Sequence, residues 1–256
     1  MNASLLIPWR VRRWCRYATN PRWRRRQVAA RRLRELTRNT VVGGPFEGMT
    51  YVPNAHGSAW CPKILGTYEQ ELRAIVEEIG ELGFANIVNI GAAEGYYAVG
   101  LARRCPGTVV TCFELNTEAH ATIRSLAEKN GVAERVTVLG ACTHDRLQAA
   151  ASRGRTCVIC DIEGAEIDIL APGLCPALVD ACLLVEVHDC KRPECGSTLR
   201  RRFGSTHDIV MIPAVVRQPA DFPSGVRLPP RLFAASLDEG RPSGMFWFWM
   251  KPKKAE

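Results

Sequence analysis

Short apolar segments alternate with helical segments along most of this chain, and the alternation restricts its fold more than any other feature. In the segments between the apolar runs, for example 96–104 and 118–130, apolar residues recur at helical spacing. Continuous apolar strands separated by helices are typical of a parallel sheet that is covered on both faces. We therefore predict an α/β protein, whose expected strands lie at 86–90, 108–114, 135–139, 156–162, 182–187, 209–213 and 245–250.

The first 40 residues differ from the rest of the chain in charge. They hold twelve Arg and a single acid, Glu35, so this segment carries +11, whereas the whole chain of 256 residues carries +8. The remainder is therefore mildly acidic, at −3. A basic arm on an acidic body suggests a tether or a docking segment. We expect one or two basic helices over 8–38, with a break near Pro21.

Three interpretations of this arm, residues 1–40, stay open. In the first, its helix only packs a few aromatic side chains on the body. In the second, it docks on an anionic membrane surface or on a protein partner. In the third, which is less favoured, its arginine and aromatic side chains bind nucleic acid.

Composition also divides the rest of the chain. A linker loop rich in Gly and Pro is expected at 41–64, followed by a main domain over 65–256 with a Pro-rich insertion at 217–243. Loops of that length in compact domains are often functional. Eleven Cys, many within apolar runs, favour buried thiols and a cytoplasmic location. No apolar run is long enough to cross a bilayer, so any membrane attachment is expected to be peripheral.

The first expected strand runs into a turn of small residues, Gly91-Ala92-Ala93-Glu94-Gly95. Such a turn lets a ligand approach the backbone closely. It departs from the dinucleotide-binding pattern, because Ala93 and Tyr96 stand where that pattern has glycine. Glu94 would repel a pyrophosphate at the start of the next helix, or it merely offsets the helix dipole. The turn therefore favours a cationic cofactor such as S-adenosylmethionine (SAM).

Acids and a histidine end the following strands. Glu114 is the last residue of the second expected strand, nineteen residues after Gly95, where an acid can accept both ribose hydroxyls. Asp161 lies at the end of the fourth expected strand, and Glu186 and His188 lie at the end of the fifth. Parallel strands end at one edge of a sheet, so we expect these side chains in one cleft, with the histidine as a general base. Taken singly, each also has a purely structural explanation, such as a helix cap or a half-buried histidine.

These segments resemble the FkbM-type family of SAM-dependent methyltransferases. The matching residues lie at 89–97, 113–114, 161–166 and 186–188, and the resemblance covers about residues 65–215. It implies the Rossmann-like class I methyltransferase fold, a seven-stranded, mostly parallel sheet whose last strand is antiparallel. It also implies O-methylation of a hydroxyl on a sugar, a glycan or a small metabolite. The chain departs from the family at Asn89 and Ala93, where Asp and Asn are usual.

The resemblance gives each candidate residue a role. His188 would take the hydroxyl proton, with Glu186 and Asp161 orienting its ring, and Asp161 or Glu69 would meet the amino group of SAM. The other cofactor-binding residues would be Gly91, Ala92, Glu94, Gly95, Glu114, Leu115, Ala141 and Cys142. No metal is predicted, although a divalent cation among Asp161, Glu186 and His188 stays an open alternative.

Two alternative functions are also considered. An RNA methyltransferase would use the basic arm to grip phosphates. A catalytically inactive methyltransferase fold would serve as a scaffold that docks through the arm, and Asn89 favours this alternative because it lacks the charge that would attract the cofactor.

Overall fold

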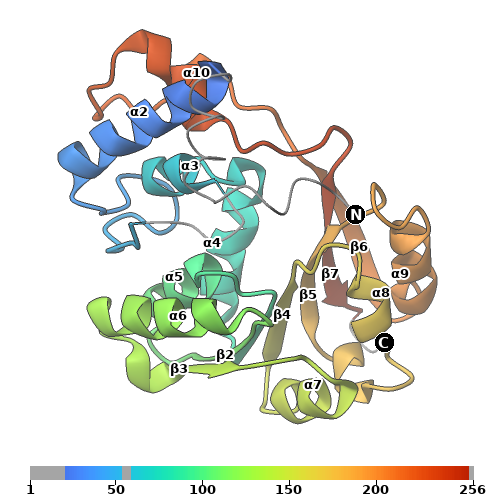
Figure 1. Ribbon diagram of the computed structural model, residues 1–256. Helices are drawn as coiled ribbons and strands as arrows, with labels where there is room; N and C mark the ends of the chain where they lie inside the picture. The colour runs from blue at the N-terminus through green and yellow to red at the C-terminus, as the bar shows by residue number, and fades with distance from the viewer. Residues whose placement is uncertain (1–20, 54–58, 254–256) are drawn as a thin grey trace, which may run out of the picture.

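The computed structural model describes residues 21–53 and 59–253, and within them seven strands form one sheet (Figure 1). The strand order is β3-β2-β1-β4-β5-β7-β6. Strands β3, β2, β1, β4 and β5 pair in parallel, whereas β7 is antiparallel to both of its neighbours. The predicted seven-stranded, Rossmann-like α/β fold is therefore confirmed. Its strands are β1 (Asn86–Ile90), β2 (Val109–Phe113), β3 (Val136–Leu139), β4 (Thr156–Cys160), β5 (Cys182–Val187), β6 (His207–Pro213) and β7 (Phe246–Pro252).

Helices cover both faces of the sheet. One hydrophobic core includes residues of α4 (Arg73–Leu82), α5 (Tyr96–Arg104) and α6 (Thr117–Lys129). A second core includes residues of α7 (His144–Ala151), α8 (Glu166–Ile169) and α9 (Cys195–Phe203). Successive residues of a strand point to opposite faces. Cys157 accordingly lies in the first core and Cys160 in the second, as their spacing predicts.

The described part of the basic arm is a helix that packs on the body. Helix α2 (Pro21–Thr37) begins at the predicted break, and residues 1–20 lie outside the described residues. Ala29 and Leu33 on its inner face are fully buried. Figure 1 shows α2 beside α10 (Phe233–Leu237), which belongs to the Pro-rich insertion, and α2 also contacts α3 (Trp60–Leu65). The inner face of α2 therefore contributes to the same core as α4 and α5.

The segment 41–64 was expected to be a linker loop, yet it contributes to the core. Phe46 and Met49 are buried, and α3 begins at Trp60, so the predicted boundary at 65 falls inside a helix. The reason is that the Gly and Pro residues are interspersed with large apolar side chains. Gly66 ends α3 with a φ of +74°, where a Cβ atom would lie 1.9 Å from the Gly43 carbonyl oxygen. The glycines thus allow tight packing here.

The sheet places a crevice between β1 and β4. The chain leaves β1 toward β2 on one side and enters β4 from β3, so the connections diverge at this point. Ligands of open α/β sheets bind outside the carboxyl ends of the strands at such a switch in strand order. Among the described residues, no helix combines the length and apolar character that crossing a membrane requires.

Candidate active site

A cavity of about 720 Å³ opens at the carboxyl edge of the sheet. Its volume lies within the range of small-molecule sites in proteins. Its wall comes from the segments that follow the first five strands, together with residues 239–242 of the insertion. The cavity therefore occupies the crevice in which this fold class binds its ligands.

The turn after β1 is held against the turn after β4. Gly91 has a φ of +78°, and a Cβ atom there would lie 1.8 Å from the Asp161 carbonyl oxygen, so a side chain does not fit. Ala93 has a φ of +48°, a region that costs a non-glycine residue about 1–2 kcal/mol. Gly91 and Ala93 both line the cavity. A ligand in the cavity therefore meets a tight, partly strained backbone turn.

Glu114 joins this turn to the end of β2. Its Oε2 accepts a hydrogen bond from the Ala93 amide at 2.7 Å, and its Oε1 accepts one from the Asn116 amide at 2.8 Å. A carboxylate has about four acceptor positions, so both oxygens keep capacity for another donor. Glu114 lines the cavity, and its orientation is fixed by the two backbone amides. It is placed to accept a pair of hydroxyl groups from a ligand.

His188 presents one ring nitrogen to the cavity and the other to a buried carboxylate. Its Nδ1 lies 2.7 Å from Glu166 Oε1, and both side chains are almost completely buried. Its Nε2 lies 3.7 Å from Asp161 Oδ1 and 3.6 Å from Glu163 Oε2. Because His188 lines the cavity, Nε2 is the atom that can exchange a proton with a ligand.

Glu166, which is absent from the predicted site, orients the histidine. The prediction gave that role to Glu186 and Asp161, but the Nδ1–H of the ring donates its hydrogen bond to Glu166, and Asp161 lies near the opposite nitrogen. Backbone amides of Ile162 and Gly164 also donate to Glu166 Oε1. The sequence signal was present, since Glu166 closes the acidic segment 161–166. A sequence alone does not tell which of several acids turns inward.

The two members of this dyad shift each other's pKa. Burial alone would lower the pKa of His188, but the hydrogen bond that its ring donates to Glu166 and the charges of the surrounding carboxylates raise it. Burial alone would raise the pKa of Glu166, but the hydrogen bonds from His188 and from backbone amides lower it. The pair therefore stabilises an imidazolium beside a carboxylate, which is the state reached after His188 accepts a proton.

Asp161 and Glu186 form a pair of neighbouring carboxyls in the cavity wall. Burial raises the pKa of both groups, and the charge of Asp161 raises that of Glu186 further. Arg241 opposes the shift through its ion pair with Glu186, but one guanidinium shared among three carboxylates does not cancel it. The pKa of each carboxyl is therefore shifted upward, as expected for like charges that share a buried site.

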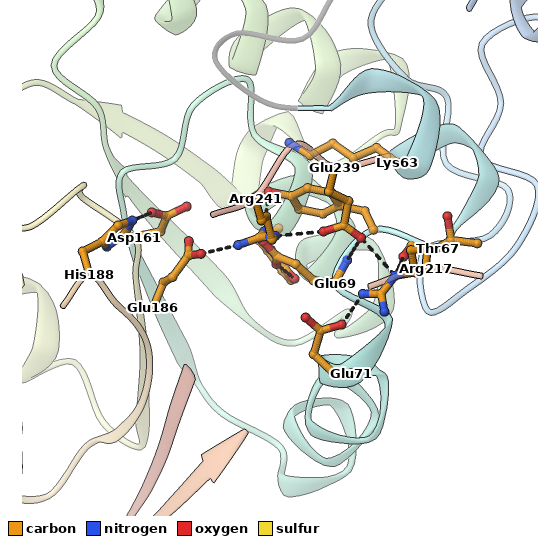
Figure 2. A network of polar contacts seen from close by, with 12 residues as sticks. Lys63, Thr67, Glu69, Glu71, Asp161, Glu186, His188, Arg217, Glu239 and Arg241 are labelled. Atoms are coloured by element: carbon orange, nitrogen blue, oxygen red, sulfur yellow. Dashed lines mark hydrogen bonds and ion pairs between the residues drawn. The ribbon is translucent and has the colours of Figure 1, made fainter. Parts of the chain in front are cut away.

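Arg241 of the insertion joins those three carboxylates at the edge of the cavity (Figure 2). It forms ion pairs with Glu69, Glu186 and Glu239, and its Nη2 donates to the Tyr68 hydroxyl at 3.1 Å. No spacing in the sequence pointed to this arginine. The length of the Pro-rich insertion was the only feature of the sequence that suggested a functional role for this segment. Arg241 ties that insertion to the end of β5.

A second arginine extends the network (Figure 2). Arg217 forms ion pairs with Glu71 and, at 3.0 Å, with Glu239. Burial raises the pKa of Glu239 to about 7, although Arg217 opposes the shift. Glu239 lines the cavity. The insertion therefore supplies the wall with a carboxyl that titrates near neutral pH.

The structure brings most of the predicted site residues into the cavity wall. Four do not reach it: Ala92, Gly95, Glu94 and Glu69. Glu69 forms an ion pair with Arg241 and accepts a hydrogen bond from the Tyr97 hydroxyl. The predicted residues that line the cavity are Gly91, Glu114, Leu115, Ala141, Cys142, Asp161, Glu186 and His188.

Glu94 turns away from the cavity. Its carboxylate is fully buried, 2.6 Å from Lys63 Nζ, and accepts a hydrogen bond from the Tyr51 hydroxyl at 2.5 Å. Lys63 balances its charge, so Glu94 neither attracts a cationic cofactor nor repels a phosphate at the turn. Glu94 was wrongly predicted to lie in the cofactor site because α3, the helix that supplies Lys63, was not expected. The departure from the glycine pattern at Ala93 and Tyr96 remains as the argument against a dinucleotide.

Asp161, Glu186 and His188 also form a potential cation site. One ligand atom from each lies within 4.8 Å of the others, and two carboxylates with an imidazole suit a divalent metal. The fit is incomplete, however, because Arg241 already pairs with Glu186 Oε1. A guanidinium bound to a ligand oxygen competes with a cation for it, so the donor set favours the metal-free arrangement.

Comparisons with known proteins find similarity at the level of structure. No protein-family model matches the chain, and no curated protein matches it. A putative O-methyltransferase from Klebsiella pneumoniae is 11% identical, with 73% of this chain and 81% of that chain covered and a TM-score of 0.47. An O-methyltransferase from Bacillus cereus in complex with SAH is 16% identical, with coverages of 71% and 80% and a TM-score of 0.46. An rRNA methylase from Streptococcus thermophilus is 11% identical, with coverages of 72% and 97% and a TM-score of 0.46.

Proposed function

We propose that this protein is a SAM-dependent methyltransferase of the FkbM type, which methylates a hydroxyl group of a small molecule or a glycan. The observation that carries the proposal is the meeting of three features in one cavity. These are the tight turn at Gly91, the oriented carboxylate of Glu114 and the His188–Glu166 dyad. The first two suit an adenosine ligand, and the third suits proton removal.

The cavity residues fit SAM in the following way. Glu114 would accept the two ribose hydroxyls, since both of its oxygens keep acceptor capacity. Leu115, Ala141 and Cys142 line the same part of the wall and offer a largely apolar surface to adenine. Asp161, whose charge is favoured beside a cation, would meet the amino group. When bound, SAM supplies a methyl group on a positively charged sulfur, which needs no further activation.

The residues on the other side of the cavity would prepare the acceptor. His188 Nε2 would take the proton of the acceptor hydroxyl, so that its oxygen can accept the methyl group that SAM supplies. Glu166 holds the ring at Nδ1 and stabilises the imidazolium that results. The largest part of the rate enhancement would come from holding oxygen, methyl and sulfur in line. Arg241 and Glu239 line the acceptor side, so the insertion would contribute to acceptor choice.

The unpaired cysteines support a reducing, cytoplasmic location for this enzyme. Ten cysteines of the described part are free, and most of them are buried. Cysteines stay unpaired in compartments that keep thiols reduced, where disulfides do not persist.

The proposal is tested by transfer of labelled methyl groups from SAM to a panel of sugars and hydroxylated metabolites. We expect His188→Gln, which keeps a partner for Glu166, to lower kcat by at least a hundredfold and to leave the dissociation constant of SAM unchanged. Addition of a metal chelator should leave the wild-type rate unchanged. An equal loss of SAM affinity and turnover in His188→Gln would contradict the role of His188 as the base. Loss of activity with chelator would restore the cation alternative.

A further inference from the structure

Helix α2 carries far more positive charge than its place in the fold requires. Its 17 residues include seven Arg and one acid, Glu35, and no acid lies in its first turn. Most of its apolar side chains face the body, where Ala29, Ala30 and Leu33 are buried. The arginines can therefore be sorted by whether they serve this packing.

Two of the arginines have structural partners on the body. Arg26 Nη2 donates to the Asp238 carbonyl oxygen at 2.5 Å, and its Nε lies 3.8 Å from the Asp238 carboxylate. Arg34 donates two hydrogen bonds to the Pro53 carbonyl oxygen, and its guanidinium lies 4.6 Å from the centre of the Trp60 ring. These contacts attach α2 to the insertion and to the segment before α3. They explain Arg26 and Arg34 without any partner molecule.

The solvent-exposed residues of α2 are rich in arginine. Arg25, Arg31 and Arg32 are exposed, and so is 53% of Leu36. Residues 25, 32 and 36 are separated by seven and four positions, so they share one side of the helix. Arg32 pairs with Glu35 at 3.6 Å, but both side chains are more than half exposed, and such a pair is weak. We call Arg25, Arg31, Arg32 and Leu36 the outer face of α2.

We propose that the outer face of α2 binds the surface of an anionic phospholipid membrane. A solvated helix face usually mixes charges of both signs, whereas this one is almost entirely positive on a chain whose remainder is acidic. Basic side chains near an anionic lipid surface each strengthen binding. Leu36 lies among the arginines, and an apolar side chain in that position can enter the boundary between headgroups and acyl chains. Figure 1 shows α2 at the periphery of the molecule.

The same features favour lipid over RNA. Proteins that hold single strands combine basic groups with aromatic side chains on which bases stack. The aromatic residue of α2, Trp23, is only partly exposed and already takes part in a contact. The outer face thus offers charge and an aliphatic side chain but no stacking surface.

The test is flotation of the full-length protein with vesicles of phosphatidylcholine, with and without 30% phosphatidylserine. We expect binding only to the anionic vesicles, and weaker binding as salt rises. The variant Arg25→Gln/Arg31→Gln/Arg32→Gln should bind these vesicles at least tenfold more weakly. The matched control Arg124→Gln/Lys129→Gln/Arg153→Gln removes the same charge from exposed positions elsewhere and should bind like the wild type.

Three outcomes would overturn the proposal. They are absence of binding to anionic vesicles, equal loss of binding in the two triple variants, and displacement of the protein from vesicles by an equimolar single-stranded RNA 20-mer. SAM affinity of both variants, measured in parallel, reports whether they fold. Membrane binding does not involve the cavity, so this test succeeds or fails independently of methyl transfer.

Discussion

At the scale of single residues, the candidate site depends on which carboxylate meets which nitrogen of His188. Glu166 occupies Nδ1, and this leaves Nε2 toward the cavity. If Asp161 or Glu186 held the ring instead, the basic nitrogen would be turned away from the acceptor. In the proposed reaction, the buried Glu166 is therefore a positioning residue, whose charge raises the pKa of His188.

Replacement of Glu166 tests this role through pH. We expect Glu166→Gln to keep a hydrogen bond to Nδ1 but to remove the charge that raises the pKa of His188. Since the base must be neutral to accept a proton, the rise of kcat with pH should begin at lower pH in the variant. An NMR titration of the His188 ring should show the same downward shift. A ring pKa identical in wild type and variant would rule out this electrostatic role.

Ala93 provides a test of backbone strain at the turn. Its φ of +48° is unfavourable for alanine and free of strain for glycine. We expect Ala93→Gly to raise the free energy of unfolding by about 0.5–1 kcal/mol in urea denaturation. The same change at the exposed helical residue Ala121 should lower it by about 1 kcal/mol. Equal destabilisation by both substitutions would contradict the strained conformation.

Positions of the site residues were predictable to the extent that they follow from strand ends. Glu114, Asp161 and His188 end apolar strands, so their meeting at one edge follows from a parallel sheet. Their partners were not predictable, because side-chain direction in a turn depends on packing against distant segments. Glu94 shows this clearly, since Lys63 from an unexpected helix turns it inward.

At the scale of elements, the unexpected feature is that α2, α3 and α10 of the insertion pack on one another. The central strands β1, β4 and β5 were predictable because their apolar runs are continuous and buried on both faces. Helix α3 was missed because it is six residues long and lies among Gly and Pro residues. Helix α2 was predicted as a helix, but its arginines concealed the apolar side chains that attach it to α10.

Two leucines of α2 test whether the helix belongs to the core. Leu33 is fully buried, and Leu33→Ala should lower the free energy of unfolding by about 2–5 kcal/mol. Leu36 lies three residues later with 53% of its surface exposed, and Leu36→Ala should change it by less than about 0.5 kcal/mol. Chemical denaturation of both variants gives the comparison. If both substitutions changed the free energy of unfolding by the same small amount, α2 would not belong to the core.

At the scale of the whole molecule, the fold separates two kinds of surface. Acidic residues converge on the cavity at the strand ends, whereas exposed arginines gather on the outside of α2. The topology alone accounts for the cavity, because the order of the strands opens a crevice between β1 and β4. It does not dictate the ligand, which depends on the side chains in that crevice. The central claim is therefore that this cavity binds SAM.

Calorimetric titration of the full-length protein with SAM, and separately with NAD, tests that claim most directly. We expect micromolar binding of SAM and none of NAD. Glu114→Gln should weaken SAM binding roughly 10–100-fold, since hydrogen bonds to a charged group contribute about 1.5–3 kcal/mol. The exposed neighbour Glu118→Gln serves as the control and should bind SAM like the wild type. Failure of the wild-type protein to bind SAM, or binding that Glu114→Gln leaves intact, would contradict the account.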